Sequence, residues 1–302
     1  MSRQTEYWER NYEVGSFGIG YLDKELRGIA KSDLILIGAR SGAGKSTIAN
    51  RIFQKNCEDG RKCALFSLEN FNDDLYSHDV MMEYKNITRN FSITPRMWQM
   101  NKFKVDYDAL EKAEAIVEKR YAGKYIINRQ ADYTKEKLKK DMIKACEEGK
   151  ELIILDHIDY VDKDNPNADD LSFMTDLMKT IRELQDKHQV AVVALSHLRK
   201  PTNSRDSVII PNENEFIGSS NKSKEATCVI LIAPDDEGNM KMQDDNTKAT
   251  WFCIRKLRNG GITNKCARLF YDKRNDLYLD KYEIYGVNYA GTKTEFIEKV
   301  GE

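Results

Sequence analysis

The chain has 302 residues, of which 40% are hydrophobic and 32% are charged, and its formal net charge is −1. That apolar share supports a packed core and argues against wholesale disorder. A net charge near zero leaves any nucleic-acid binding to local basic patches. No apolar run is long enough to span a membrane and no apolar N-terminal stretch resembles a signal peptide, so we expect a cytoplasmic protein that does not bind membranes.

Short, nearly continuous apolar runs recur between stretches of helical periodicity, a pattern typical of strands buried on both faces of a parallel sheet. In chain order the runs are Leu34–Gly38, Cys63–Leu68, Tyr125–Ile127, Leu152–Leu155, Val190–Leu195 and Cys228–Ile232. The helices expected between them are Ser46–Cys57, Thr134–Glu148 and Asp169–His188. This alternation predicts a doubly wound, mainly parallel α/β sheet.

The last third of the chain has a different character. Thr250–Arg255 and Ala267–Tyr271 flank a turn with the sequence Asn259-Gly260-Gly261, which predicts a C-terminal β-hairpin. No composition shift divides the chain into two domains. We expect one core domain over residues 31–282, an N-terminal arm or linker over residues 1–30, and a C-terminal tail over residues 283–302.

A glycine-rich loop lies directly after the first apolar run and before the first expected helix, which is the setting that a phosphate-binding loop requires. Its backbone N–H groups and the start of the helix favour a bound triphosphate. Lys45 is expected to reach the β- and γ-phosphates, and the Ser46 hydroxyl to ligate Mg²⁺. Ala39 stands where the strict pattern has glycine. An incidental glycine-rich turn is the alternative, and the flanking elements argue against it. The expected nucleotide-binding residues are Ala39, Arg40, Ser41, Gly42, Ala43, Gly44, Lys45, Ser46 and Thr47.

Three further polar residues stand at the ends of predicted strands, where ligands bind in open α/β sheets. Asp156 follows four apolar residues and is the natural second ligand of Mg²⁺. Glu69 could activate the attacking water or be an ordinary loop glutamate, and His197 could sense the γ-phosphate or be a satisfied strand-end histidine. The pattern alone leaves both alternatives open.

With these strand ends in line, the chain resembles the RecA-type core of the hexameric DnaB-like replicative DNA helicases, nearest to the branch of the phage primase–helicase and mitochondrial Twinkle. Beyond the phosphate loop, the matching segments are Phe17-Gly-Ile-Gly-Tyr-Leu-Asp23, Phe66-Ser-Leu-Glu69, Ile154-Leu-Asp-His157, Leu195-Ser-His-Leu198 and Arg255-Lys-Leu-Arg-Asn-Gly260. The resemblance as a whole covers the residues from Gly15 to Tyr278. Nothing in the sequence resembles the primase or the N-terminal collar domain of the family.

The resemblance implies roles for the matching residues. Glu69 would be the catalytic base, Asp156 the Mg²⁺ ligand and His197 the γ-phosphate sensor. Lys256 and Arg258 would enter the ATP site of the neighbouring subunit, with Arg258 as the arginine finger. Tyr271 falls where the phage branch stacks a tyrosine on the nucleotide base, although an ordinary half-buried strand tyrosine fits the pattern equally well.

The family places its DNA-contacting loop between the histidine-bearing strand and the next one. In this chain that segment is polar and locally basic, as expected of a loop that follows a phosphate backbone, and its candidate DNA-binding residues are Arg199, Lys200, Arg205, Lys222 and Lys224. Acidic Glu213 and Glu215 interrupt it, and Ile217 stands where the family has an arginine. A polar loop without DNA contacts is the alternative.

The resemblance therefore implies an ATP- and Mg²⁺-dependent DNA helicase that moves along single-stranded DNA as a homo-oligomer, either a hexameric ring or a helical filament. A primase or loader on a separate chain would be a partner, and the cytoplasm of a host carrying a phage or mobile element would be a fitting location. A second hypothesis is a RecA-fold switch that binds ATP, oligomerises and recruits a partner without unwinding DNA. A monomeric P-loop kinase, with 73–120 as its lid, is disfavoured because Lys256 and Arg258 would then have no purpose.

Overall fold

The computed structural model describes residues 2–69, 74–128, 130–163, 165, 167–199, 210–216, 222–242, 246–258, 260–261, 263–288 and 293–301. Within these ranges, ten strands form one sheet in the order β12-β11-β10-β9-β8-β3-β7-β6-β4-β5. The six strands at one end of this order are parallel: β3 (Leu34–Ala39), β4 (Cys63–Ser67), β5 (Tyr125–Asn128), β6 (Leu152–Asp156), β7 (Ala191–His197) and β8 (Cys228–Pro234). They correspond to the six apolar runs, so the predicted doubly wound sheet is confirmed.

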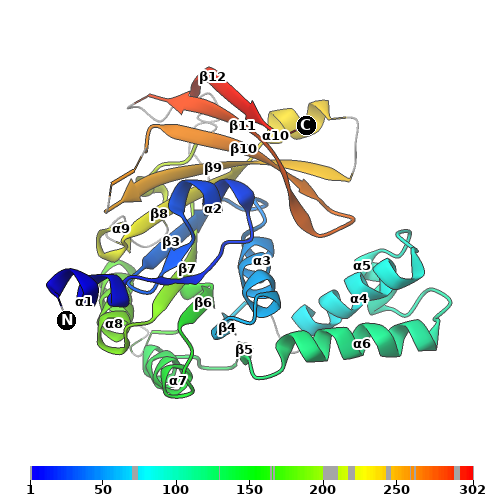
Figure 1. Cartoon of the computed structure of the whole chain (residues 1–302), viewed down its shortest axis with the longest axis horizontal. Helices are drawn as coiled ribbons and strands as arrows, with labels where there is room; N and C mark the ends of the chain where they lie inside the picture. Colours follow the sequence, from blue (N-terminus) through cyan, green and yellow to red (C-terminus); the bar gives the residue numbers. More distant parts are fainter. Residues whose placement is uncertain are drawn as a thin grey trace.

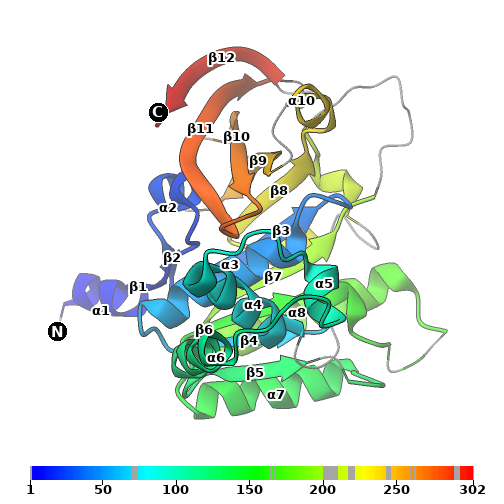
Figure 2. The same cartoon turned by 90° about the vertical axis from the view of Figure 1, so that its right-hand side faces the viewer.

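Helices cover both faces of the parallel strands (Figures 1 and 2). The helix α3 (Lys45–Glu58) packs Ile48, Ile52 and Phe53 into the apolar core on one face. On the other face, α7 (Lys135–Glu147) and α8 (Asp170–His188) bury their apolar sides in a second core. Both helices begin at the predicted residues, because the side chains of Thr134 and Asp169 accept hydrogen bonds from backbone N–H groups in the first turn.

The predicted hairpin is part of a larger antiparallel extension of the sheet. It consists of β9 (Thr247–Leu257), β10 (Lys265–Asp272), β11 (Leu277–Val287) and β12 (Lys293–Val300). The prediction of a tail over residues 283–302 is wrong, because this segment contains the end of β11 and all of β12. Along β11, buried Tyr282 and Ile284 alternate with less buried neighbours. A search for continuous apolar runs misses such half-buried strands.

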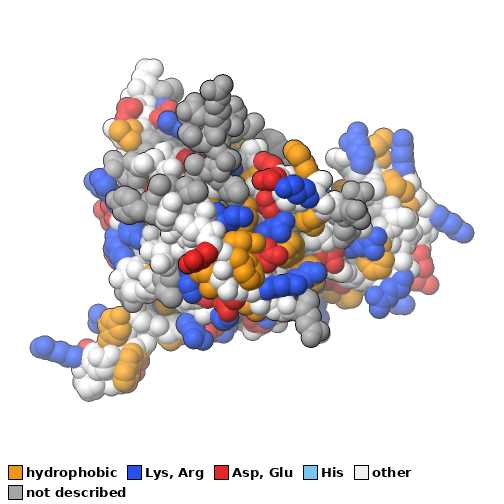
Figure 3. Space-filling view, turned by 90° about the horizontal axis from the view of Figure 1, so that it is seen from above, with side chains coloured by type: hydrophobic (Ala, Val, Ile, Leu, Met, Phe, Trp, Pro, Cys, Tyr) orange, Lys and Arg blue, Asp and Glu red, His pale blue; other side chains and the backbone are white. Residues whose placement is uncertain are grey.

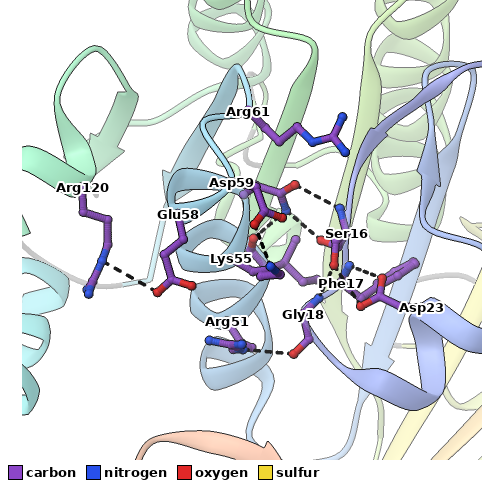
Figure 4. A network of polar contacts seen from close by, with 12 residues as sticks. Ser16, Phe17, Gly18, Asp23, Arg51, Lys55, Glu58, Asp59, Arg61 and Arg120 are labelled. Atoms are coloured by element: carbon purple, nitrogen blue, oxygen red, sulfur yellow. Dashed lines mark hydrogen bonds and ion pairs between the residues drawn. The ribbon is translucent and has the colours of Figure 1, made fainter.

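The first thirty residues are only partly an arm. The helix α1 (Arg3–Arg10) buries none of its residues and projects from the body (Figure 1). Beyond it, β1 (Glu13–Gly15) pairs with β2 (Ile29–Ala30), and α2 (Gly20–Leu26) lies between them. Asp23 accepts hydrogen bonds from the backbone N–H of Phe17 (2.7 Å) and from the Ser16 hydroxyl (2.9 Å), while Arg51 of α3 donates to the Gly18 carbonyl (Figure 4). This lead-in therefore braces the helix that follows the phosphate loop.

Three helices form a lobe beside the sheet: α4 (Asp74–Thr88), α5 (Pro95–Gln99) and α6 (Tyr107–Tyr121). They enclose a small apolar cluster of their own, which includes Tyr84 and Val117, and they stand out from the body in Figures 1 and 3. On the face drawn in Figure 3, basic and acidic side chains are interspersed. The remaining short elements are η1 (Ile158–Tyr160), η2 (Glu213–Glu215), α9 (Lys222–Glu225) and α10 (Asp236–Lys241). None of the helices in the described ranges has the length and apolar character needed to cross a membrane.

Candidate nucleotide site

The sheet topology brings the predicted site residues to one edge. Neighbouring parallel strands β3, β7, β6 and β4 end side by side, with Ala39 opposite His197 and Ser67 opposite Asp156 in the strand register. The phosphate loop continues from β3, Glu69 lies two residues beyond β4, and Asp156 ends β6. This is the edge at which open α/β sheets bind their ligands.

The phosphate loop has the backbone conformation that its glycines permit. Gly42 and Gly44 have φ angles of 78° and 85°, in the left-handed region, and Gly44 is the N-cap of α3. Ala39 and Ala43 are buried, Ser41 is exposed, and Ser46 and Thr47 are half-buried in the first turn of α3. The turn therefore exposes backbone N–H groups at the positive end of a 14-residue helix, an arrangement that favours phosphate.

Lys45 lies between two acids. Its Nζ is 3.2 Å from Oε2 of Glu69 and 3.7 Å from Oδ1 of Asp156, and the side chain is only 7% exposed. The Ser46 hydroxyl lies 3.4 Å from the same Glu69 oxygen. Although burial raises the pKa of Glu69, the neighbouring Lys45 ammonium outweighs burial and holds that pKa below its ordinary value. Glu69 is therefore ionised near neutral pH, as a general base must be.

The Asp156 carboxylate is suited to a cation. Oδ1 is buried and has no hydrogen-bond partner among the described residues, and burial raises the pKa of this carboxyl above its ordinary value despite the nearby Lys45. A buried carboxylate oxygen that accepts no hydrogen bond is costly, and a metal cation beside the Lys45 ammonium would offset that cost. Carboxylate and hydroxyl oxygens are preferred ligands of Mg²⁺, so Asp156 and Ser46 fit this ion.

Two residues absent from the predicted set complete this edge: His157 and Asp159. Nδ1 of His157 is 3.1 Å from Oδ2 of Asp159, which leaves Nε2 facing Glu69 at 3.6 Å. The His157 and His197 rings meet edge to face, with centroids 4.2 Å apart. Ligand atoms of Glu69, His157 and His197 all lie within 4.8 Å of one another, close enough for a transition-metal ion. The signal in the sequence was the second acid after the β6 strand, three residues beyond Asp156.

Arg40 of the phosphate loop pairs with an acid outside the loop. Its guanidinium forms a bidentate ion pair with Glu215 of η2, both contacts being 2.8 Å. Nearby, Phe216 pairs with Leu198 in an isolated bridge and is fully buried against the strand end at Gly38. Glu215, which interrupts the basic segment, therefore anchors that segment to the phosphate loop.

The two predicted finger residues lie far from this edge. Nζ of Lys256 is 2.6 Å from the Ser223 carbonyl, and Nη2 of Arg258 is 2.6 Å from the Lys224 carbonyl. Because β9 is antiparallel to β8, its C-terminal end lies at the opposite edge of the sheet. Tyr271, by contrast, pairs with Lys248 at the near end of β9, and Lys248 donates a hydrogen bond to the Gly42 carbonyl. Tyr271 thus lies on the side of the phosphate loop, where a nucleotide base could stack.

The candidate DNA-binding residues are divided. Arg199 and Lys224 are exposed. Lys222 is fully buried, and its Nζ is 2.6 Å from Oδ1 of Asp159, so its prediction as a DNA contact is wrong. A lysine flanked by polar residues gives no sign in the sequence of the buried acid that it meets. Lys200, Arg205 and Ile217 lie outside the described residues.

Taken together, the sheet, the phosphate loop and the strand-end acids define a nucleotide-binding domain of the RecA-like P-loop class. Residues 16–278 match the family model of the DnaB-like helicase C-terminal domain, and the chain belongs to that family. Among curated proteins it is similar to the replicative DNA helicase DnaB of Geobacillus stearothermophilus, with 24% identity over 269 residues. This match covers 84% of the chain and 54% of the relative, so the chain spans about half the length of that protein.

Solved structures are similar in fold. An ATPase domain superposes with a TM-score of 0.70 at 16% identity, covering 91% of this chain and 95% of that one. A structure of a DnaB-like replicative helicase and its interactions with primase superposes with a TM-score of 0.70 at 15% identity. The match covers 89% of this chain and 62% of that one. A KaiC-like protein from Pyrococcus horikoshii superposes with a TM-score of 0.53 at 12% identity, and the match covers 89% of this chain and 97% of that one. At these identities the structural likeness shows the fold alone.

Proposed function

We propose that this chain is the motor domain of a DnaB-like DNA helicase, which hydrolyses ATP with Mg²⁺ at subunit interfaces and moves along single-stranded DNA. One observation carries the proposal: Lys45, Glu69 and Asp156 meet at the carboxyl edge of the sheet, directly beside a phosphate loop. Membership of the family supports the same function.

Each side chain of this edge has a role in hydrolysis. Lys45 leaves its two acids to bind the β- and γ-phosphates, and the backbone N–H groups from Gly42 to Ser46 cradle them. Ser46 and Asp156 hold Mg²⁺, which when bound neutralises charge on the phosphate oxygens. Glu69, released from Lys45, accepts a proton from the attacking water, and His197 contacts the γ-phosphate. Arg40, Ser41, Ala43 and Thr47 shape the loop, and Tyr271 stacks on the base.

Completion of the site by a second copy is part of the proposal. Lys256 and Arg258 lie at the far edge of the sheet, where they can extend into the ATP site of a neighbouring protomer but not into their own. The exposed apolar side chains of α1 offer a second contact to that neighbour. We propose a ring or filament built in this way, hexameric if closed, with Arg258 as the arginine finger.

The single-stranded DNA would follow the basic segment after β7, contacted by Arg199 and by Lys200, Arg205 and Lys224. A primase or loader on a separate chain is a further proposed partner, and we propose the cytoplasm as the place of all these steps.

The second candidate is an ATP-driven switch that oligomerises and recruits a partner without unwinding DNA. Acidic Glu213 within the basic segment favours it, whereas Glu215 no longer does because it pairs with Arg40. Two measurements on the purified chain separate the candidates: ATP hydrolysis with and without oligo-dT, and strand separation on a forked duplex. DNA-stimulated hydrolysis with strand separation supports the helicase. Hydrolysis that is indifferent to DNA at low salt supports the switch, and a Lys45→Ala variant supplies the inactive control.

A further inference from the structure

Near the proposed ATP site, Asp159 has hydrogen-bonding partners on both of its carboxylate oxygens. Oδ2 accepts from the backbone N–H of His197 (2.6 Å) and faces Nδ1 of His157 (3.1 Å). Oδ1 accepts from the Ser196 hydroxyl (3.0 Å) and from Nζ of Lys222 (2.6 Å). Two donors on each oxygen leave little freedom for this carboxylate, because it has about four acceptor positions in all.

Lys222 holds the Oδ1 oxygen of Asp159, whereas the two histidines contact the Oδ2 oxygen. Its side chain is fully buried, and its Nζ also lies 2.9 Å from the Ser196 hydroxyl. Burial opposes ionisation of both partners, but the His157 hydrogen bond and the Lys222 ammonium hold the pKa of Asp159 well below its ordinary value. Asp159 is therefore ionised, and the buried Lys222 amino group, whose pKa burial lowers, lies within hydrogen-bond distance of it.

The pair spans the ends of two central strands. Asp159 belongs to η1, which follows β6, whereas Lys222 begins α9, which leads into β8. Between β6 and β8 in the sheet lie β7 and β3. Pairing between β6 and β7 ends at Leu155 and Ala194. Beyond that point the Asp159 side chain accepts the hydrogen bonds of β7, from the Ser196 hydroxyl and the His197 backbone N–H.

Buried ion pairs seldom add stability over a well-packed apolar pair, so stability alone gives no reason for charges here. The geometry offers another reason. Asp159 fixes Nδ1 of His157 and so turns Nε2 toward Glu69, and it fixes the backbone of His197, whose ring contacts that of His157. A misplacement of about 1 Å at a reacting centre can cost about 100-fold in rate.

We propose that Asp159 and Lys222 form a buried positioning pair that holds His157 and His197 against the γ-phosphate end of the ATP site. This inference rests on the proposed hydrolysis of ATP at that site. Neither member of the pair contacts the nucleotide; both act through the two histidines.

The test compares Asp159→Asn, Lys222→Met, the double variant and a control. The control is Lys85→Met, which replaces another buried lysine (5% exposed), in α4, whose ammonium interacts with Asp276 rather than with Asp159. Either single variant should lower kcat by about tenfold or more with KM for ATP changed less than about twofold, as expected for lost positioning. The double variant should lose no more than the worse single variant, because paired residues are not additive. The control should keep its kcat even where its Tm falls.

Histidine side-chain NMR supplies a readout that lost stability would not move, and it requires no activity. The chain has four histidines, so the ring signals can be assigned with His157→Gln and His197→Gln. We expect wild-type His157 to carry a proton on Nδ1, and Lys222→Met or the double variant to shift the His157 and His197 signals but not those of His78 and His188. If the wild type hydrolyses ATP and both kcat and these signals are unchanged in folded variants, the inference is wrong. If the wild type hydrolyses no ATP, the proposed function fails, and unchanged histidine signals would then overturn the positioning pair as well.

Discussion

Lys248 and Arg258 stand near opposite ends of β9 and contact opposite edges of the sheet. Lys248 donates to the carbonyl of Gly42 in the phosphate loop, whereas Arg258 donates to the carbonyl of Lys224, 2.6 Å away. They are ten residue steps apart along the strand, or about 33 Å at the usual rise per residue. The protein therefore cannot bring its own Arg258 to its own phosphate loop without unfolding the strand.

Removal of the Arg258 guanidinium should therefore leave ATP affinity nearly intact and abolish DNA-stimulated turnover. An arginine finger supplied by a neighbour contributes about 10³–10⁵ in rate. Steady-state hydrolysis of Arg258→Ala with oligo-dT, beside nucleotide binding by the same variant, checks this. Arg96→Ala, which removes an exposed arginine in α5, should behave as the wild type.

Mixing experiments test whether the finger acts between subunits. In a mixture of Arg258→Ala with Glu69→Gln, some interfaces join an intact Glu69 to an intact Arg258 from the adjoining copy. Hydrolysis should reappear in the mixture although each variant alone is inactive. A mixture as inactive as its components would show that Arg258 does not complete a neighbour's site.

The Glu69 carboxylate should be needed for chemistry but not for binding. Glu69→Gln keeps the shape of the side chain and removes the base, so kcat should fall by about 10²–10⁴. The Lys45 ammonium loses one of its two acidic neighbours in this variant, and ATP affinity should stay equal or rise. Equilibrium binding and single-turnover hydrolysis separate the two effects. A variant that turns over at the wild-type rate would assign the base to another residue.

The pH dependence of kcat/KM should report the unusual state of His197. Burial and the neighbouring Lys45 ammonium lower the pKa of His197 below its ordinary value of 6.5. The neutral ring is therefore favoured, and the ring gains a proton only when the pH falls through this lowered pKa. Activity should stay level as the pH falls through 6.5 and decline only in more acidic solution. In His197→Gln, the decline of kcat/KM in acid that His197 causes should disappear. A wild-type decline of kcat/KM centred above pH 6.5 would contradict its assignment to His197.

The parallel half of the fold could be predicted because each of its strands is buried on both faces and so appears as an unbroken apolar run. The phosphate loop and Asp156 were recognisable because their chemistry requires fixed residues at fixed distances from a strand. The positions of Lys222 and Glu215 could not be predicted, because a charged residue is expected to be exposed unless a partner distant in the sequence is known. The partner of Lys222 is Asp159, and the partner of Glu215 is Arg40. The strand β12 was missed because none of its eight residues is buried and six are exposed, so that its pairing with β11 alone defines it.

Single-stranded DNA binding should depend on Arg199 through its charge alone. This side chain is exposed just beyond the end of β7, at the edge of the sheet where the phosphate loop lies. Loss of one phosphate contact should reduce the slope of log affinity against log salt by about 0.7. Fluorescence anisotropy of labelled oligo-dT over a range of salt concentrations measures this slope for Arg199→Ala. Lys187→Ala, which removes an exposed charge in α8, is the matched control, and equal slopes for the two variants would remove Arg199 from the DNA interface.

Assembly should depend on the apolar side chains of α1. Tyr7 and Trp8 are 54% and 64% exposed on a helix that buries nothing within its own chain. Buried aromatic anchors at interfaces commonly contribute about 2 kcal/mol or more, so the double variant Tyr7→Ser/Trp8→Ser should dissociate an assembly that the wild type forms with a non-hydrolysable ATP analogue. Light scattering during size-exclusion chromatography measures the mass of each species. Met240→Ser, at an 85% exposed position on α10, controls for the loss of surface apolarity in general. If the α1 variant and the control both keep the wild-type mass, α1 does not join adjacent subunits, and the interface must be built from the Lys256 and Arg258 edge without it.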